Sequence, residues 1–369
     1  MRIVIDARII NSTTGRYVER LLYYLQEIDK TNDYIVLLLE KDLDYWKPTS
    51  PNFSVVVANF DQYSLAEQFG LKKLLDSLEA DLVHFCMPQQ PVLYKGKKVT
   101  TIHDLTLLKV YNSDKNWLIY RIKQAVGYFV FKRVVSTSKH IIAPTDFTKN
   151  EIIDFSKRAV GKISTIYNAA DISNNKSEPY NSPFKQFLLY VGHQSDYKNI
   201  RRLASAHQRL IKKYPDLGLI LVGSLEGTKN ASALNNKKFF EEKGYKNILF
   251  TGFVSDEQLS WLYKNTSAYV FPSLMEGFGL PGLEAMGHDA PVVSSNATCL
   301  PEVYEDAAYY FDPTDVTDMA RATDEVLDDK SLRDKMIKKG HAQFKKYSWK
   351  KTAEQTHRVY MDALENKSN

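Results

Sequence analysis

The stretch that decides the fold is QFLLYVGHQSDYKNIRRLASAHQRLIKKYPDLGLILVG, residues 186–223. It opens with a strand-like segment, 186–192, that is apolar after Gln186, as expected for a strand that is buried on both faces. After a polar loop, residues 199–214 carry apolar side chains at helical spacing, namely Ile200, Leu203, Ala204, Leu210 and Ile211. A second apolar run, 217–223, completes a strand–helix–strand unit of the kind that builds parallel sheets.

The same alternation extends in both directions along the chain. Further strands are predicted at 2–7, 34–39, 54–58, 81–85, 98–102, 140–144, 162–167, 247–252, 268–273, 290–295 and 307–312. A segment rich in Asn, Ser and Pro without periodicity, 168–184, separates the two halves and is typical of a linker. The pattern therefore predicts an α/β protein with two doubly wound parallel sheets, whose ligands bind at the carboxyl ends of the strands.

Composition excludes several classes of protein. The chain has 369 residues, of which 44% are hydrophobic and 25% charged, as in folded soluble proteins and unlike disordered, collagenous or coiled-coil chains. No apolar run approaches the ~20 residues of a membrane-spanning helix, and the first residues, MRIVIDARI, fit a strand better than a signal peptide. The two cysteines, Cys86 and Cys299, suit a reducing cytosol and exclude a disulfide framework.

Positive charge is concentrated in one segment. The chain has a net charge of +5, yet residues 105–150 alone hold eight Lys/Arg against two Asp, a local net charge of +6. Within this segment, WLIYRIKQAVGYFVFKRVV (117–135) interleaves aromatic and basic residues. It fits either an ordinary helix with a solvated basic face or a surface that meets anionic lipid. Nucleic acid is disfavoured because no module that reads a groove is present.

Candidate functional residues are most concentrated in the segment FPSLMEGFGLPGLEAMG (271–287). Two glycines follow Glu276, Pro281 suits the first turn of a helix, and Glu284 lies about one turn further on. The amides of Leu280 and Gly282 at the helix start, together with the helix dipole, favour a phosphate group. The alternative is an ordinary strand–loop–helix turn with a glutamate near its positive end.

This segment resembles the E-x7-E signature of glycosyltransferase family 4, retaining enzymes of the GT-B fold. The resemblance extends to YVGHQSDYKNIRRL (190–203), FTGFVSDEQLSWLYKNTSAYVFPS (250–273), LPEVYEDAAYYFDPTD (300–315), IHDL (102–105), IIAPTDFTKNEI (141–152) and YSWKKTAEQTHRVYMDAL (347–364). It implies two Rossmann-like domains facing each other across a cleft. These are an acceptor-binding domain (1–170), a linker (171–185), a nucleotide-sugar-binding domain (186–346) and a closing helix that returns to the first domain (347–369).

The resemblance also implies a role for particular residues. Lys198 would bind the diphosphate, Glu276 the hydroxyls of the transferred sugar, and Glu284 those of the ribose. The remaining donor-binding residues would be Gly279, Leu280, Gly252, Phe253, Val254 and Gly15. The family often has an arginine where this chain has Tyr197, so one phosphate cation is either missing or supplied elsewhere, with Arg201 and Arg202 as the candidates.

His103 and Asp104 follow the predicted strand 98–102. A neighbouring His–Asp pair suits acid–base chemistry, and a histidine that satisfies backbone groups at the strand end is the alternative. By resemblance both residues line the cleft as positioning and electrostatic groups, and they join Glu276 and Lys198 as the predicted catalytic set. No spaced metal-ligand cluster is apparent, so no metal and no other cofactor are expected.

The predicted function is transfer of a hexose, mannose as the first choice, from a nucleotide diphosphate sugar to a hydroxyl of a glycan or lipid-linked acceptor. Two alternatives stay open, a nucleotide-sugar 2-epimerase of the same fold and a non-catalytic sugar-nucleotide or glycan-binding protein. The expected location is the cytoplasm, with peripheral contact to an anionic membrane through residues 117–135.

Overall fold

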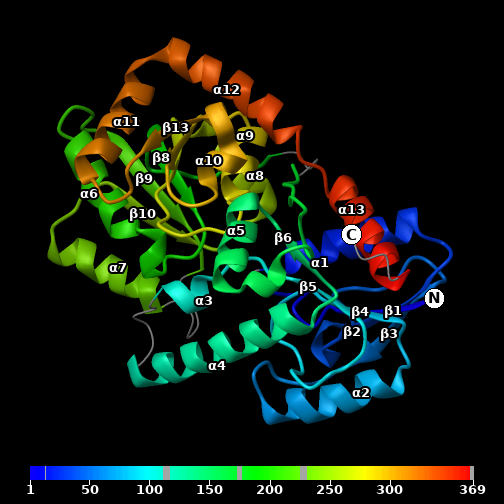
Figure 1. The fold of residues 1–369 in the computed structure, drawn as a ribbon. Coiled ribbons are helices and arrows are strands. Elements are labelled where there is room, and N and C mark those ends of the chain that lie inside the picture. The colour runs from blue at the N-terminus through cyan, green and yellow to red at the C-terminus, as the bar shows by residue number, and fades with distance from the viewer. Residues whose placement is uncertain (13, 111–116, 173–176, 225–230, 366–369) are drawn as a thin grey trace. The chain divides into compact units, whose positions relative to one another are not determined.

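The structure, a computed structural model, describes residues 1–12, 14–110, 117–172, 177–224 and 231–365. The chain divides into two compact units, each an α/β unit with its own parallel sheet (Figure 1). The first unit comprises Met1–Leu108, Arg121–Asn168 and Ser348–Asn369, and the second comprises Lys109–Tyr120 and Ala169–Tyr347.

The first sheet has seven parallel strands in the order β3-β2-β1-β4-β5-β6-β7. The strands are β1 (Arg2–Asp6), β2 (Asp33–Leu38), β3 (Phe53–Val57), β4 (Leu82–Phe85), β5 (Lys98–Thr101), β6 (His140–Ala143) and β7 (Ile163–Thr165). The helices are α1 (Gly15–Ile28), α2 (Lys72–Ser77), α3 (Thr106–Lys109), α4 (Trp117–Thr137), α5 (Asp146–Phe155) and α13 (Trp349–Leu364), with short turns η1 (Glu40–Asp42), η2 (Glu67–Leu71) and η3 (Lys157–Ala159).

The second sheet has six parallel strands in the order β10-β9-β8-β11-β12-β13. The strands are β8 (Gln186–Val191), β9 (Leu217–Val222), β10 (Ile248–Gly252), β11 (Ala268–Phe271), β12 (Val292–Ser295) and β13 (Ala308–Phe311). The helices are α6 (Ile200–Leu210), α7 (Ala231–Glu242), α8 (Asp256–Asn265), α9 (Leu280–Gly287), α10 (Leu300–Tyr304), α11 (Val316–Asp328) and α12 (Lys330–Phe344), with short turns η4 (Asp196–Lys198) and η6 (Glu305–Ala307).

Each predicted strand is present within two residues of its expected bounds. The central strands are buried along their length, as β9 illustrates with no exposed residue. Such strands are covered by helices on both faces, which is why they carry unbroken apolar runs. The prediction of two doubly wound parallel sheets is therefore confirmed.

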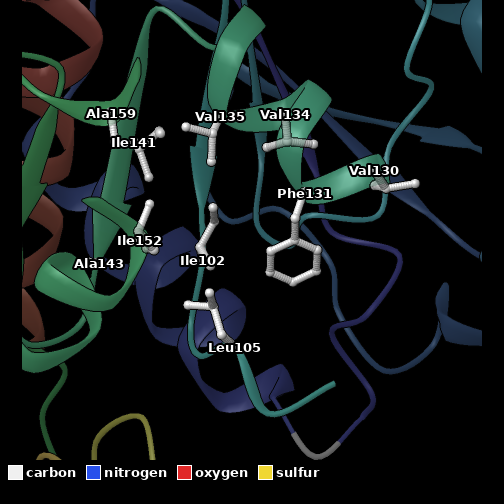
Figure 2. Packing of buried hydrophobic residues seen from close by; sticks show 10 residues of the cluster. All are labelled: Ile102, Leu105, Val130, Phe131, Val134, Val135, Ile141, Ala143, Ile152 and Ala159. Atoms are coloured by element: carbon white, nitrogen blue, oxygen red, sulfur yellow. The ribbon is translucent and has the colours of Figure 1, made fainter. Parts of the chain in front are cut away.

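Helix α4 buries one side and leaves the other exposed. Figure 2 shows Phe131 and Val135 pointing from α4 toward a cluster of buried apolar side chains, to which Val130 and Val134 of the same helix also belong. The other members come from β5 with the segment after it, β6, α5 and η3, namely Ile102, Leu105, Ile141, Ala143, Ile152 and Ala159. The burial of this side fixes the helix on the sheet, while its basic residues stay in solvent.

The C-terminal helix α13 is part of the first unit, as predicted. It packs against α1, and the Thr352 hydroxyl donates a hydrogen bond to the carbonyl of Tyr167 at 2.7 Å. Two further contacts reach the sheet region, His357 Nε2 to Asp29 Oδ2 at 2.9 Å and the Tyr360 hydroxyl to His84 Nδ1 at 2.5 Å. Helix α13 also buries Trp349, Ala353, Val359 and Tyr360, so it forms part of the hydrophobic core of the first unit.

Candidate active site

The second unit has its topological switch point between β8 and β11. From β8 the chain winds outward through β9 to β10, and from β11 it winds the other way through β12 to β13. In sheets of this type the ligand crevice lies outside the carboxyl ends of the strands at this point. Lys198 lies on the segment that follows β8, and Glu276 lies on the segment that follows β11.

Lys198 and Glu276 form an ion pair, with Nζ and Oε1 2.5 Å apart. Their side chains are 15% and 12% exposed, so both charges are largely withdrawn from water. The two loops are also tied through Asn199, whose side-chain amide donates to the carbonyls of Pro272 (3.0 Å) and Pro313 (2.7 Å). The ion pair is thus held by a fixed framework.

Lys198 supplies a positive charge to this crevice, and two aromatic rings lie beside its ammonium group. Its ammonium lies 5.1 Å from the centre of the Tyr197 ring and 5.8 Å from that of Phe271, within cation–π range. Arg201 was expected as a possible second cation. Its side chain instead donates to Asn236 on α7 at 3.0 Å, and its guanidinium group packs on an aromatic ring of the same helix. Arg202 donates to Asn199 Oδ1 at 3.0 Å.

Helix α9 begins at the predicted glycine turn. Gly279 has a φ of 94°, in the left-handed region, and an added Cβ would lie 2.5 Å from the hydroxyl of Tyr304. That hydroxyl donates to the carbonyl of Gly279 and fixes the turn. The amide of Gly282, expected to be open, donates to the same carbonyl at 3.2 Å, so the amide of Leu280 is the stronger phosphate candidate.

The two signature glutamates lie on the same strand–loop–helix segment but in different surroundings. The hydroxyl of Tyr263 lies 3.4 Å from Glu284 Oε2, at the far end of hydrogen-bond range. The backbone of Glu276 is held on both sides, since its amide donates to Thr298 Oγ1 and its carbonyl accepts from Cys299 Sγ, both at 3.3 Å. Burial, together with the charge of Glu276, raises the pKa of the Cys299 thiol, which excludes a thiolate there.

Three glycines at the ends of β8, β9 and β10 bring backbone segments together, and only one of them was predicted as a site residue. The amide of Gly223 donates to the carbonyl of Gly252 at 3.2 Å, and a Cβ on Gly223 would lie 2.4 Å from the carbonyl oxygen of Gly192. The signal was available, because the apolar runs of these three strands all end in glycine. Beyond Gly252, Phe253 is 88% exposed, whereas Val254 is buried.

Two polar side chains near the switch point were missed entirely. Gln194, after β8, is 5% exposed, and Ser273, after β11, is fully buried. Within the described residues, neither the Gln194 amide group nor the Ser273 hydroxyl has a hydrogen-bond partner. Buried groups of this kind are normally satisfied, so these two could take part in binding a polar ligand.

Gly15, His103 and Asp104 belong to the first unit. Gly15 is the first residue of α1, and a Cβ there would lie 1.8 Å from the carbonyl oxygen of Ile10, so the close approach requires glycine. Asp104 Oδ1 accepts the amide of Thr106 at 2.8 Å, which supports the start of α3.

His103 lies beside Tyr17, with ring centres 4.8 Å apart in an edge-on arrangement. Burial lowers the pKa of His103 despite the opposing effect of Asp104, so the ring is neutral near pH 7. His103 Nε2 lies 3.0 Å from the carbonyl oxygen of Cys86, which can only accept a hydrogen bond. Nε2 therefore carries the proton, and Nδ1 is left as an acceptor.

Among the described residues there is no group of three or more His, Cys, Asp or Glu side chains arranged to hold a metal ion. No helix in that same part of the chain combines the length and hydrophobicity needed to cross a bilayer.

Comparison with known proteins identifies the family. Residues 15–174 match the model "Glycosyltransferase Family 4", and residues 172–343 match "Glycosyl transferases group 1". The chain is 32% identical to O-antigen chain mannosyltransferase B of Escherichia coli over 279 residues, 72% of this chain and 70% of that protein. It is 27% identical to the serotype-specific mannosyltransferase WbdA of E. coli, covering 94% of this chain but only 45% of WbdA.

Solved structures agree on the fold. Sucrose-phosphate synthase from Thermosynechococcus elongatus has a TM-score of 0.80 at 17% identity, covering 99% of this chain and 100% of that one. HepE of Anabaena, solved with UDP and glucose, has a TM-score of 0.74 at 18% identity, covering 98% and 100%. The chain therefore belongs to glycosyltransferase family 4 and has the GT-B fold. The prediction of a glycosyltransferase is confirmed, in preference to an epimerase or a non-catalytic binding protein.

Proposed function

We propose that this glycosyltransferase moves a mannosyl group from a nucleotide diphosphate sugar to a hydroxyl of a cell-envelope glycan or its lipid-linked precursor, with retention of anomeric configuration. The observation that carries the proposal is the Lys198–Glu276 pair at the switch point of the second sheet. The choice of mannose rests on the two E. coli relatives named as mannosyltransferases.

In the proposed chemistry, Lys198 acts on the leaving phosphate of the donor and Glu276 acts on its sugar. As the glycosidic bond breaks, negative charge develops on the leaving phosphate, and Lys198 with the Leu280 amide at the α9 N-terminus would stabilise it. Positive charge develops on the sugar, where the carboxylate of Glu276 would be favourable. A diphosphate beside Lys198 competes with Glu276 for the ammonium, which would free the carboxylate for the sugar hydroxyls.

The remaining donor contacts follow the same division. Glu284 would accept hydrogen bonds from the ribose hydroxyls, because an ionised carboxylate suits a vicinal diol. The exposed ring of Phe253 and the backbone of Gly252 and Val254 would meet the base. In a front-face mechanism the leaving phosphate oxygen takes the proton of the acceptor hydroxyl, so no enzymatic nucleophile is required. In the first unit, Gly15, His103 and Asp104 would position the acceptor or the phosphates.

The proposal includes metal independence, since Lys198 and the helix amide supply the charge stabilisation that a divalent cation would otherwise give. Transfer measured with excess EDTA should remain near its control value. A loss of activity that Mg²⁺ or Mn²⁺ restores would contradict this part of the mechanism.

The proposal also places the enzyme in the cytoplasm, against an anionic membrane surface that α4 contacts. Four exposed basic residues lie on α4, namely Arg121, Lys123, Lys132 and Arg133, and the sequence has no acidic residue between Asp114 and Asp146. Large apolar side chains are exposed on the same helix, Ile122 at 58% and Phe129 at 61%. This combination favours the interface of an anionic bilayer.

The decisive experiment is incubation of the purified chain with GDP-mannose, UDP-glucose and UDP-N-acetylglucosamine, each with a mannose-containing acceptor. The anomeric configuration of the product is then read by NMR. An α-linked mannoside formed from α-configured GDP-mannose supports the proposal. Transfer from a UDP-sugar alone would overturn the choice of sugar, and an inverted product would overturn the retaining mechanism.

A further inference from the structure

The first unit has a switch point of its own, between β1 and β4. The chain winds outward from β1 through β2 to β3, and from β4 through β5 and β6 to β7. A ligand crevice is therefore expected at the carboxyl ends of β1 and β4. Two residues from loops at this edge meet there, because Gln89 Nε2 donates to the hydroxyl of Tyr63 at 2.6 Å. Tyr63 follows β3 and Gln89 follows β4.

Tyr63 has a strained backbone. Its φ is 61°, in the left-handed region that bulky residues rarely adopt. Such strain persists only where the surroundings enforce it, and it concentrates at functional sites. Its ring is nevertheless 43% exposed, so the conformation does not serve to bury the side chain.

A buried ion cluster enforces this conformation. The amide of Tyr63 donates to Glu67 Oε2 at 2.8 Å, and Glu67 Oε1 accepts from Arg8 Nη2 at 2.9 Å. Arg8 also forms two hydrogen bonds of 2.8 Å with the carboxylate of Asp6, the last residue of β1. All three charged side chains are at least nine-tenths buried. The loop that carries Tyr63 is therefore anchored directly to the strand at the switch point.

The pair presents a defined set of binding groups. Because the Tyr63 hydroxyl accepts from Gln89, its own proton is available for donation to a ligand. Burial of this hydroxyl raises the pKa of Tyr63 to about 12, so the proton is retained near neutral pH. Gln89 Oε1 is buried and, within the described residues, has no hydrogen-bond partner. An aromatic face, a neutral donor and an amide acceptor thus lie together.

We propose that Tyr63 and Gln89 form a subsite for a hexose unit of the acceptor glycan. A pyranose has an apolar C–H face that can pack on the exposed ring and hydroxyls that can bond to the phenol and to the amide oxygen. A lipid chain would use the ring but would leave the amide oxygen unpaired. The assignment of this sugar to the acceptor rests on the proposed function.

The test uses Tyr63→Gly, with Glu79→Gly as its matched control. Glu79 is also an exposed residue of the first unit with positive φ, 48°. Glycine removes the strain at both positions, so each variant should unfold within about 4 °C of the wild type. Tyr63→Gly should raise the acceptor KM at least tenfold while leaving the donor KM unchanged, and Glu79→Gly should change neither. An unchanged acceptor KM in a folded Tyr63→Gly variant overturns the inference.

Direct binding separates this inference from the proposed function. Saturation-transfer NMR with methyl α-mannoside and an α-linked mannobiose should detect contact in the wild type, and Gln89→Leu or Tyr63→Gly should abolish it. If sugar binds in this way but no donor is turned over, the proposed function fails and the subsite stands. If donor is turned over but neither sugar binds, the subsite is wrong. Weakened binding of anionic phospholipid vesicles by Tyr63→Gly, with sugar binding unchanged, would assign the ring to the membrane and overturn the subsite.

Discussion

Lys198 and Glu276 are 78 residues apart in sequence, and their side chains meet at 2.5 Å across the switch point of the second sheet. Because both are mostly buried, each charge compensates the other. Removing one partner of such a pair leaves the other charge buried without a compensating charge. Substitutions that keep the shape of the side chain are therefore the informative ones.

Substitutions of the two signature glutamates should change different kinetic parameters. Glu276→Gln should lower kcat by roughly 10²–10³, because one preorganised electrostatic contact to a transition state is worth about 2.7–4 kcal/mol. Glu284→Ala should mainly raise the donor KM, by about one to two orders of magnitude, because contacts to the ribose are similar in ground and transition states. Steady-state kinetics and nucleotide affinity should be measured on both variants. A wild-type kcat in Glu276→Gln would refute the assignment.

Membrane binding should depend on the charge of α4. Reversing Arg121, Lys123, Lys132 and Arg133 together should remove most sedimentation with vesicles that contain anionic lipid, since each basic residue near such a surface contributes about 1 kcal/mol. The matched control reverses four exposed lysines of the second unit, Lys237, Lys335, Lys338 and Lys345. Equal losses in both variants would indicate a non-specific charge effect, and unchanged sedimentation in the α4 variant would return α4 to an ordinary solvated helix.

Gly279→Ala should destabilise the fold more than an alanine at another positive-φ glycine. Gly161 has a φ of 78° with nothing within 4 Å of an added Cβ, so Gly161→Ala should cost only the backbone strain, about 1–2 kcal/mol. At Gly279 the new methyl group also meets Tyr304, which should add roughly 1–3 kcal/mol. Urea unfolding of both variants measures the difference. Equal losses would mean that the α9 turn relaxes around the methyl group.

Stability should fall as pH drops below the ordinary titration range of histidine. Burial, reinforced by His103, lowers the pKa of His84 to about 3, whereas an unfolded chain protonates it near 6.5. Between these values the unfolded state binds the extra proton, so the free energy of unfolding should decrease by up to about 1.4 kcal/mol per pH unit from this residue. His84→Gln should flatten this slope in urea titrations at pH 4–7.

The fold was predictable because its strands are buried on both faces and stand out as unbroken apolar runs. The roles of Lys198 and Glu276 came from the family resemblance, and the sheet topology explains why they meet, since both lie just beyond the carboxyl ends of neighbouring parallel strands. Here the local sequence and the sheet topology both point to the loops at the carboxyl ends of these strands.

The conformation of Tyr63 and the orientation of Arg201 could not be predicted, because both depend on contacts between residues far apart in the sequence. The positive φ of Tyr63 is imposed by Glu67 and Arg8, and Arg8 is 59 residues from Glu67 in sequence. The orientation of Arg201 depends on Asn236 of a helix that follows the next strand. The family resemblance made Arg201 a candidate for the phosphate, and only the tertiary contact shows that it reaches α7.

The contact between Tyr360 and His84 joins residues 276 positions apart, and it has a consequence for synthesis on the ribosome. Strands β1 to β7 emerge first, but the core that they form is completed only when α13 arrives, after the whole second unit has been translated. Domains generally fold as units in order of emergence. Here the second sheet can close while the first still exposes the surface that α13 will cover. The N-terminal half should therefore remain open to chaperones and proteases until translation is nearly finished.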